Sequence, residues 1–378
     1  MTFKEIIEKN KLEKLNDIGF LKFKKDIELK KGLKFEKGID YPLKFSYIKE
    51  GIREGGFDEG INIDKFLDSM AYILGIDSKL ENTEDYKKIL KGLLDEPAKY
   101  YISKIVENFK ESPIDSLIYT SSYNKLFSTN KRIELIEKES LSNLLDSLKE
   151  ELDSRDFEWE TQNILNSYEE MTLKYENFAP PYLHLAYIYE GEENYIKAKL
   201  YYEKFLEKSG DNKLKDEVRE ELLKIEDYVN IESAKTYLAY GEAYKAINYL
   251  KNVSMDYFDR EEFYFLMGRS YYLLGESQEA EEYLQKSFNE EITDDNASQL
   301  AMILVNENKL DKAEKILKSA EEKIKDSFII YYNLASIYYL KNNEKKALEY
   351  YEKAHKIDNL EEVEKIIRNL KKGLTVKK

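Results

Sequence analysis

The chain lacks cysteine, and its 378 residues include only five prolines and two histidines. Without cysteine there can be no disulfide, zinc–thiolate site or thiol catalysis. His184 lies beside apolar residues with no second histidine or acid at the spacing of metal ligands, and His355 lies on a second helix of a repeat, so we expect both to be packed or hydrogen-bonded side chains. We therefore predict no catalytic residue, no cofactor and no metal, and we do not expect an enzyme.

Arginine is also scarce, with seven copies against 53 lysines, and acidic residues outnumber basic ones by 75 to 60. A net charge of −15 opposes binding to polyanions. The first 50 residues are locally basic, with 13 lysines and nine acids, and Phe20, Phe23, Phe35 and Phe45 each have a lysine close by. We interpret this segment as ordinary helix and strand faces and do not expect nucleic acid as a partner.

Long apolar runs are absent too. The opening stretch MTFKEIIEKNKLEKL is not a secretory signal, and no window reaches the length of a membrane-spanning helix. We expect a cytoplasmic protein that does not interact with membranes. The abundance of Lys, Ile, Asn, Glu and Tyr is typical of a bacterial-like, AT-rich coding composition, so the 32 tyrosines do not by themselves indicate function.

An internal repeat dominates the last 200 residues. Five segments align, beginning at Tyr182, Ser233, Tyr264, Ser298 and Tyr331. Each has a small residue in a first helical stretch: Ala186, Ala234, Gly268, Ala301 and Ala335. Each has another in a second stretch: Ala198, Ala246, Ala280, Ala313 and Ala347. The intervals between these second alanines are 48, 34, 33 and 34 residues.

The pattern predicts stacked helical hairpins. Apolar residues at three- and four-residue spacings mark amphipathic helices, and the small residues let paired helix axes approach closely. One hairpin cannot bury its apolar face alone, so neighbouring hairpins stack. Residues 179–361 resemble the tetratricopeptide repeat family, although Tyr182, Tyr264 and Tyr331 replace its frequent tryptophan and its closing proline is absent. The resemblance implies an all-α superhelix that binds proteins or peptides.

The remaining boundaries follow from this register. The long interval places an insert near 213–226, and the apolar spacing there predicts one helix of about 42 Å running into the second hairpin. We expect a capping helix and basic tail over 362–378. Residues 111–178 are helical and either degenerate repeats or a separate segment. Residues 1–110 form a mostly helical region of unassigned fold, in which 1–60 could hold short strands.

Helices are predicted at 61–75, 83–94, 97–110, 113–128, 131–150 and 157–176, with Ser112-Pro113 as a helix start. The one glycine-rich stretch, GIREGGFDEG at 51–60, has Phe57 and Asp58 where a phosphate loop needs lysine and serine or threonine. We interpret it as a turn.

The leading functional hypothesis is a non-enzymatic scaffold that binds a peptide or protein segment in the concave groove lined by the first helices. The alternative is a regulator that senses a partner or peptide, with residues 1–178 as its effector domain. An enzyme with its site in 1–110 is a third hypothesis, which a deep pocket with converging polar groups would favour.

In each first helix, one predicted groove residue directly follows the packed small residue. The other predicted residues of that helix lie three or four positions before or after that groove residue. Together the predicted groove residues are Leu183, Tyr187, Ile231, Lys235, Phe265, Arg269, Tyr272, Met302, Val305, Tyr332, Ser336 and Tyr339. The family resemblance implies that a terminal carboxylate could be bound by lysine, asparagine and arginine on the groove helices. The corresponding face here has Lys235 and Arg269, with Asn333 displaced beside it, and its other positions are apolar or small, so we do not expect such a carboxylate clamp. The open alternatives are a groove filled by the N-terminal region and one filled by a second copy in a homo-oligomer.

Overall fold

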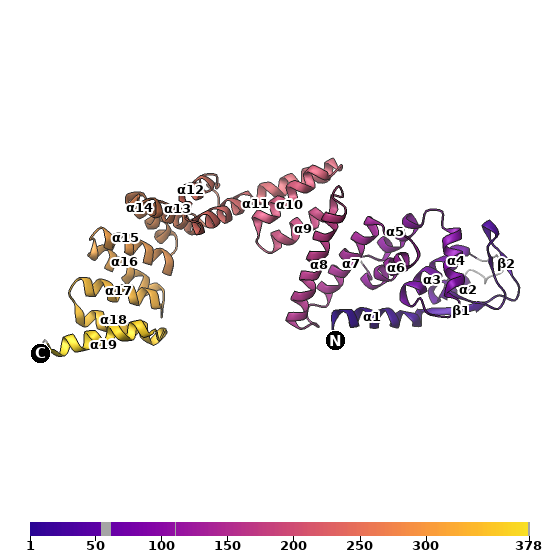
Figure 1. Ribbon diagram of the computed structural model, residues 1–378, viewed down its shortest axis with the longest axis horizontal. Helices are drawn as coiled ribbons and strands as arrows, with labels where there is room; N and C mark the ends of the chain where they lie inside the picture. Colours follow the sequence, from indigo (N-terminus) through magenta and orange to yellow (C-terminus); the bar gives the residue numbers. More distant parts are fainter. Residues whose placement is uncertain (54–61, 110, 377–378) are drawn as a thin grey trace. The chain divides into compact units, whose positions relative to one another are not determined.

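The computed structural model describes residues 1–53, 62–109 and 111–376, and most of them are helical (Figure 1). Most of the stretch 51–60 therefore lies outside the described residues, so its interpretation as a turn stays a prediction. The chain divides into two compact units. We call residues 1–188 with 201–212 the first unit, and residues 189–200 with 213–378 the second unit.

The segment that the sequence left unassigned holds short strands. After α1 (Phe3–Glu13), strand β1 (Ile18–Lys22) pairs antiparallel with β4 (Asp40–Lys44), with Ile18 opposite Lys44. Between them, β2 (Ile27–Glu28) pairs with β3 (Lys34–Phe35). Phe35 is buried, and the ring of Phe23 stacks on it with centroids 5.3 Å apart. These two phenylalanines thus belong to the core, whereas Phe20 and Phe45 are exposed.

Helix α2 (Phe45–Arg53) lies where the sequence predicts no helix. The other helices of the N-terminal region begin and end close to their predicted positions. They are α3 (Ile63–Ile76), α4 (Thr83–Leu93), α5 (Pro97–Asn108), α6 (Pro113–Leu126), α7 (Lys131–Ser147) and α8 (Ser154–Lys174). The predicted start at Ser112 is confirmed, because the Ser112 side chain accepts a hydrogen bond from the Asp115 N–H and Pro113 opens the helix. Helix α8 begins three residues earlier than predicted, because Asp153 caps it through the Arg155 N–H.

The repeat region consists of paired helices in the predicted order. The bounds are α9 (Pro180–Gly191), α10 (Tyr195–Lys208), α11 (Asn212–Ala239), α12 (Ala243–Leu250), α13 (Arg260–Leu274), α14 (Ser277–Glu290), α15 (Asp294–Asn306), α16 (Leu310–Lys323), α17 (Phe328–Leu340), α18 (Glu344–Ile357) and α19 (Glu361–Val376). From α12 to α19, each helix contacts the next along the chain. The small residues that defined the repeat are buried in both helices of each pair.

A residue with positive φ lies in the turn of each of the five hairpins. Gly275 adopts a φ of 78° directly after α13, where a side chain would be strained, and Asn308 and Asn342 take the same left-handed conformation in later turns. In the first hairpin this conformation falls on Glu193 rather than on Asn194. The Asn194 side chain instead accepts a hydrogen bond from the Lys197 N–H.

The prediction of one long helix through the insert is confirmed. Helix α11 runs without a break through the insert into the second repeat, and its 28 residues correspond to about 42 Å. Helix α19 packs on α18 and buries Val363, Ile367 and Leu370 in the same core cluster as the last two repeats. It therefore covers the apolar face that the final hairpin would otherwise expose.

Candidate partner-binding surface

The predicted groove residues lie on the first helices of the five repeats. Leu183 and Tyr187 are on α9 in the first unit, and the other ten lie in the second unit, on α11, α13, α15 and α17. Tyr187 is half exposed, and its ring meets that of Tyr202 edge-on. Of the ten residues of the second unit, Arg269 is exposed, and the other nine line one of three cavities or pack against the core.

The largest of these cavities, about 440 Å³, lies between α15 and α17, and we call it the α15–α17 cavity. Three predicted residues line it: Met302, Val305 and Ser336. Two further lining residues, Ile329 and Leu340, have exposed side chains, as Met302 does. An opening edged by exposed apolar side chains on adjacent helices suits an aliphatic or aromatic group from a partner.

Polar groups also line the α15–α17 cavity. Within the described residues, Ser298 Oγ and Gln299 Oε1 are buried and have no hydrogen-bond partner. Ser298 is only 9% exposed. A buried polar atom without a partner costs about 1–3 kcal/mol, so both atoms would be stabilised by a polar group entering the cavity.

The helical face that lines the cavity is rotated from the predicted one. On α17 the lining residues are Ile329, Asn333, Ser336 and Leu340. Tyr332 instead stacks on Phe328 and meets the Tyr351 ring edge-on, so it packs inward. Tyr339 lines a different cavity of about 390 Å³, together with Tyr351, Ile366 and Leu370.

Ile231 and Lys235 line a third cavity of about 230 Å³, which we call the acid–aromatic cavity. Its other lining residues are Glu193, Tyr195, Tyr228, Glu232, Tyr257 and Glu262. Ile231 is 3% exposed and belongs to the core of the second repeat, so little of its side chain can contact a partner. Phe265 packs between two core clusters, and Tyr272 packs against one of them.

Lys235 and Arg269, the two cations considered for a carboxylate clamp, differ in their surroundings. Lys235 Nζ lies 2.5 Å from Glu262 Oε1, so its charge is already compensated within the chain. Arg269 is exposed on α13. Sequence reasoning did not place Ser298, Asn333 and Ile329 in the groove. Ser298 lies four residues before Met302, whereas Asn333 and Ile329 lie three and seven residues before Ser336, and these spacings put side chains on one face of a helix.

The histidines are placed as expected. The His184 ring stacks on Tyr168 with centroids 5.0 Å apart, and its Nε2 lies 2.7 Å from Glu139 Oε1. His355 is partly buried on α18, and its Nδ1 has no hydrogen-bond partner in the described part of the chain. Among residues 1–53, 62–109 and 111–376, no group of His, Asp and Glu is arranged to hold a metal ion.

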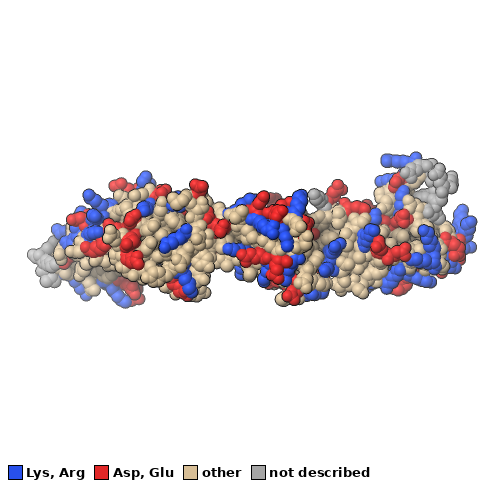
Figure 2. Space-filling view, turned by 90° about the horizontal axis from the view of Figure 1, so that it is seen from above, with Lys and Arg blue, Asp and Glu red and all other residues tan. Residues whose placement is uncertain are grey.

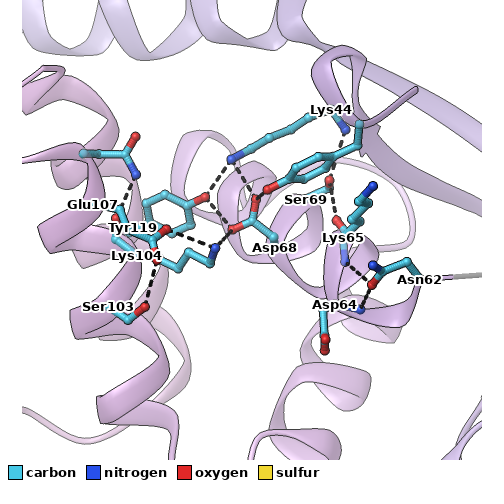
Figure 3. Close-up of polar contacts among 12 residues, drawn as sticks. Lys44, Asn62, Asp64, Lys65, Asp68, Ser69, Ser103, Lys104, Glu107 and Tyr119 are labelled. Atoms are coloured by element: carbon cyan, nitrogen blue, oxygen red, sulfur yellow. Dashed lines mark hydrogen bonds and ion pairs between the residues drawn. The ribbon is translucent and has the colours of Figure 1, made fainter. Parts of the chain in front are cut away.

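A polar network that the sequence did not predict lies in the first unit (Figure 3). Asp68 on α3 is 2% exposed, and its carboxylate accepts hydrogen bonds from the hydroxyls of Tyr47 and Tyr119, each at 2.7 Å. Lys44 Nζ lies 2.9 Å from the same carboxylate and Lys104 Nζ 3.7 Å. Burial raises the pKa of Asp68, but Lys44 and these hydrogen bonds outweigh it, so the pKa lies below its usual value.

This network bears on the hypothesis of an enzyme site in 1–110. Its polar groups converge on one another, as the dashed contacts of Figure 3 show, and they satisfy the Asp68 carboxylate internally. A cavity of about 70 Å³ in the same region is lined by other residues, among them Gly32, Glu36, Tyr41 and Asp85. The arrangement joins elements of the fold, and its chemistry is that of a buried ion pair.

Charge is mixed over the surface. On the face shown in Figure 2, basic and acidic side chains are interspersed on both units rather than separated by sign. No helix within the described ranges is long and apolar enough to cross a membrane.

Models of the tetratricopeptide repeat match residues 179–210, 261–289 and 328–360, which are the first, third and fifth predicted repeats. The second and fourth repeats supply the intervening hairpins α11–α12 and α15–α16. No curated protein matches the sequence. The register of the three matches agrees with the buried small residues, since each match spans one helical pair.

Among solved structures similar to the chain, YrrB and TTC0263 are described as TPR proteins. YrrB, described as having an unusual peptide-binding site, is 19% identical, with 52% of this chain and 94% of YrrB covered and a TM-score of 0.35. MamA is 18% identical, with 46% and 95% covered and a TM-score of 0.34. The thermophilic protein TTC0263 of Thermus thermophilus is 17% identical, with 51% and 98% covered and a TM-score of 0.33. These scores are too low to locate a binding site. The three matched segments show that the chain contains tetratricopeptide repeats, and each of them coincides with one helical pair of the structure.

Proposed function

We propose that the chain binds a peptide or protein segment along the first helices of the second unit, with the α15–α17 cavity as the main anchor site. The observation that carries this proposal is the lining of the cavity. It combines exposed apolar side chains with two buried polar atoms that lack hydrogen-bond partners among the described residues. A peptide supplies both an apolar side chain and main-chain polar groups.

The size of the cavity agrees with this use. About 440 Å³ accommodates a large side chain with its adjoining main chain, and the opening is on the surface of the solenoid rather than in a sealed core. Asn333 and Ser336 add polar groups on the α17 side. The aliphatic anchor would supply most of the affinity, and the polar groups would orient the segment.

The proposal is tested with Met302→Glu combined with Leu340→Glu, introduced into the full chain as bait for quantitative affinity capture. Both side chains are about half exposed, so the substitutions should leave the fold intact while placing two charges at the opening. We expect the partners captured by the parent chain to fall at least tenfold, as for loss of a central anchor. The captured partner is then purified, and its affinity for both proteins is measured directly.

The matched control is Leu223→Glu combined with Met255→Glu. These side chains are also exposed, lie in the second unit and line neither the α15–α17 cavity nor the acid–aromatic cavity. Equal capture by the parent and the cavity variant, or equal loss in the control, would refute this proposal.

A further inference from the structure

The acid–aromatic cavity differs in chemistry from the α15–α17 cavity. Its wall combines three tyrosine rings with three carboxylates, contributed by the turn after α9, by the start of α10, by α11, by Tyr257 and by the start of α13. Lys235 is the one basic residue in its lining. Because Ile231 and Lys235 belong to the predicted groove, the cavity adjoins the surface on which we place the partner.

The rings form a continuous aromatic wall. Tyr195 stacks on Tyr228 with centroids 4.7 Å apart, and Tyr257 meets Tyr228 edge-on at 5.9 Å. The face of an aromatic ring carries partial negative charge and attracts an ammonium or guanidinium group. The wall is therefore suited to a cation that also has an apolar stem, as lysine and arginine do.

The carboxylates leave negative charge uncompensated. Lys235 neutralises Glu262, but within the described residues Glu193 and Glu232 have no cationic partner. Glu232 Oε2 accepts the Ile196 N–H at 2.9 Å, which fixes this carboxylate at the cavity wall. Burial raises the pKa of Tyr195, and the negative charges of Glu193 and Glu232 raise it further.

We propose that the acid–aromatic cavity binds a lysine or arginine side chain of the partner segment. The proposal rests on the proposed function and adds that the partner is cationic next to its apolar anchor. The Lys235 ammonium already lies against Glu262 at the cavity, so the cavity lining accommodates a cation. The carboxylates of Glu193 and Glu232 remain for a second cation. An acidic segment would be repelled, and a neutral one would desolvate these carboxylates without compensation.

The test uses small probes in place of the unidentified partner. The methylamides of Nα-acetyl-lysine, Nα-acetyl-arginine and Nα-acetyl-norleucine are titrated into the full chain, and binding is followed by saturation-transfer difference NMR. Norleucine has the apolar stem of lysine without its charge. We expect the dissociation constants of the lysine and arginine probes to be at least fivefold lower than that of the norleucine probe. Glu193→Gln combined with Glu232→Gln should remove most of this difference, because glutamine keeps an acceptor for the Ile196 N–H.

The control separates a site from general attraction to an acidic protein. Glu279→Gln combined with Glu322→Gln makes the same change in net charge at exposed positions on α14 and α16. Equal binding of the norleucine probe, or equal weakening in this control, would overturn the cation site. Because the probes bind without a partner, the result is independent of the capture experiment. A cation site could therefore be confirmed while the groove proposal fails, or the reverse.

Discussion

A single carboxylate, that of Asp68, joins β4, α2, α3, α5 and α6 in the first unit. Lys44, Tyr47, Lys104 and Tyr119 all reach it from elements that are distant in sequence. The Lys44 ammonium also lies 4.1 Å from the centre of the Tyr72 ring, which compensates part of its desolvation. A buried ion pair of this kind adds little net stability over a well-packed apolar core, but removing one partner leaves the other charge uncompensated.

We therefore predict that Asp68→Asn destabilises the first unit by about 3 kcal/mol, because the largely buried Lys44 loses its counter-charge. The pKa of Asp68 is lowered in the folded state, so its stabilising effect is complete above the unfolded pKa and is lost as pH falls through the folded pKa. Urea unfolding from pH 7 down to pH 3 should show a shallower loss of stability in Asp68→Asn than in the parent. Asp64→Asn, an exposed acid on the same helix, should behave like the parent; an unchanged midpoint in Asp68→Asn would contradict the prediction.

Among the elements, the α13–α14 pair shows how the repeat depends on a small residue. Gly268 is buried in α13, and a Cβ added there would lie 2.7 Å from Leu284 Cγ and 3.0 Å from the Leu284 backbone nitrogen. The leucine side chain can adjust, but the backbone of α14 must move with its helix. The small residue therefore sets the distance between the two helix axes.

Gly268→Ala should lower the stability of the second unit by about 1–3 kcal/mol despite the higher helix propensity of alanine, because overpacking outweighs that gain. Thermal unfolding followed by circular dichroism would show the loss as a lower Tm. Gly191→Ala is the control, since a Cβ there meets no atom within 4 Å. A Gly268→Ala variant as stable as the parent would mean that the small residue does not control the helix spacing.

How far sequence predicts an element depends on how local its signals are. The start of α6 could be predicted because its cap and Pro113 are adjacent, and α11 because its apolar spacing is continuous. The strands β2 and β3 are two residues long and carry no periodicity of their own. The face of α17 could not be fixed, since one step along a helix turns the side chain by about 100° and the choice between Tyr332 and Asn333 depends on packing with α18. The acid–aromatic cavity joins residues from Glu193 to Glu262, which no local pattern connects.

At the scale of the whole molecule, the repeats of the second unit are stabilised by their neighbours. The core cluster from α14 to α19 is continuous, and it includes Val363, Ile367 and Leu370 of the last helix. In such an array each repeat is stabilised by the next, and the terminal repeat needs a cap with a polar outer face. Helix α19 has that form, with buried apolar residues on one side and exposed charges such as Arg368 and Lys372 on the other.

The final prediction concerns this cap. Ile367→Asp places an unpaired charge in the core between α18 and α19, and we expect a loss of about 3 kcal/mol or more together with detachment of α19. Detachment would expose the apolar face of α18, so the variant should self-associate at concentrations where the parent chain does not, as measured by sedimentation velocity. Lys372→Asp introduces the same residue on the exposed side of the helix and should change neither stability nor association. If Ile367→Asp keeps the Tm and the sedimentation coefficient of the parent, α19 does not act as the cap of the solenoid.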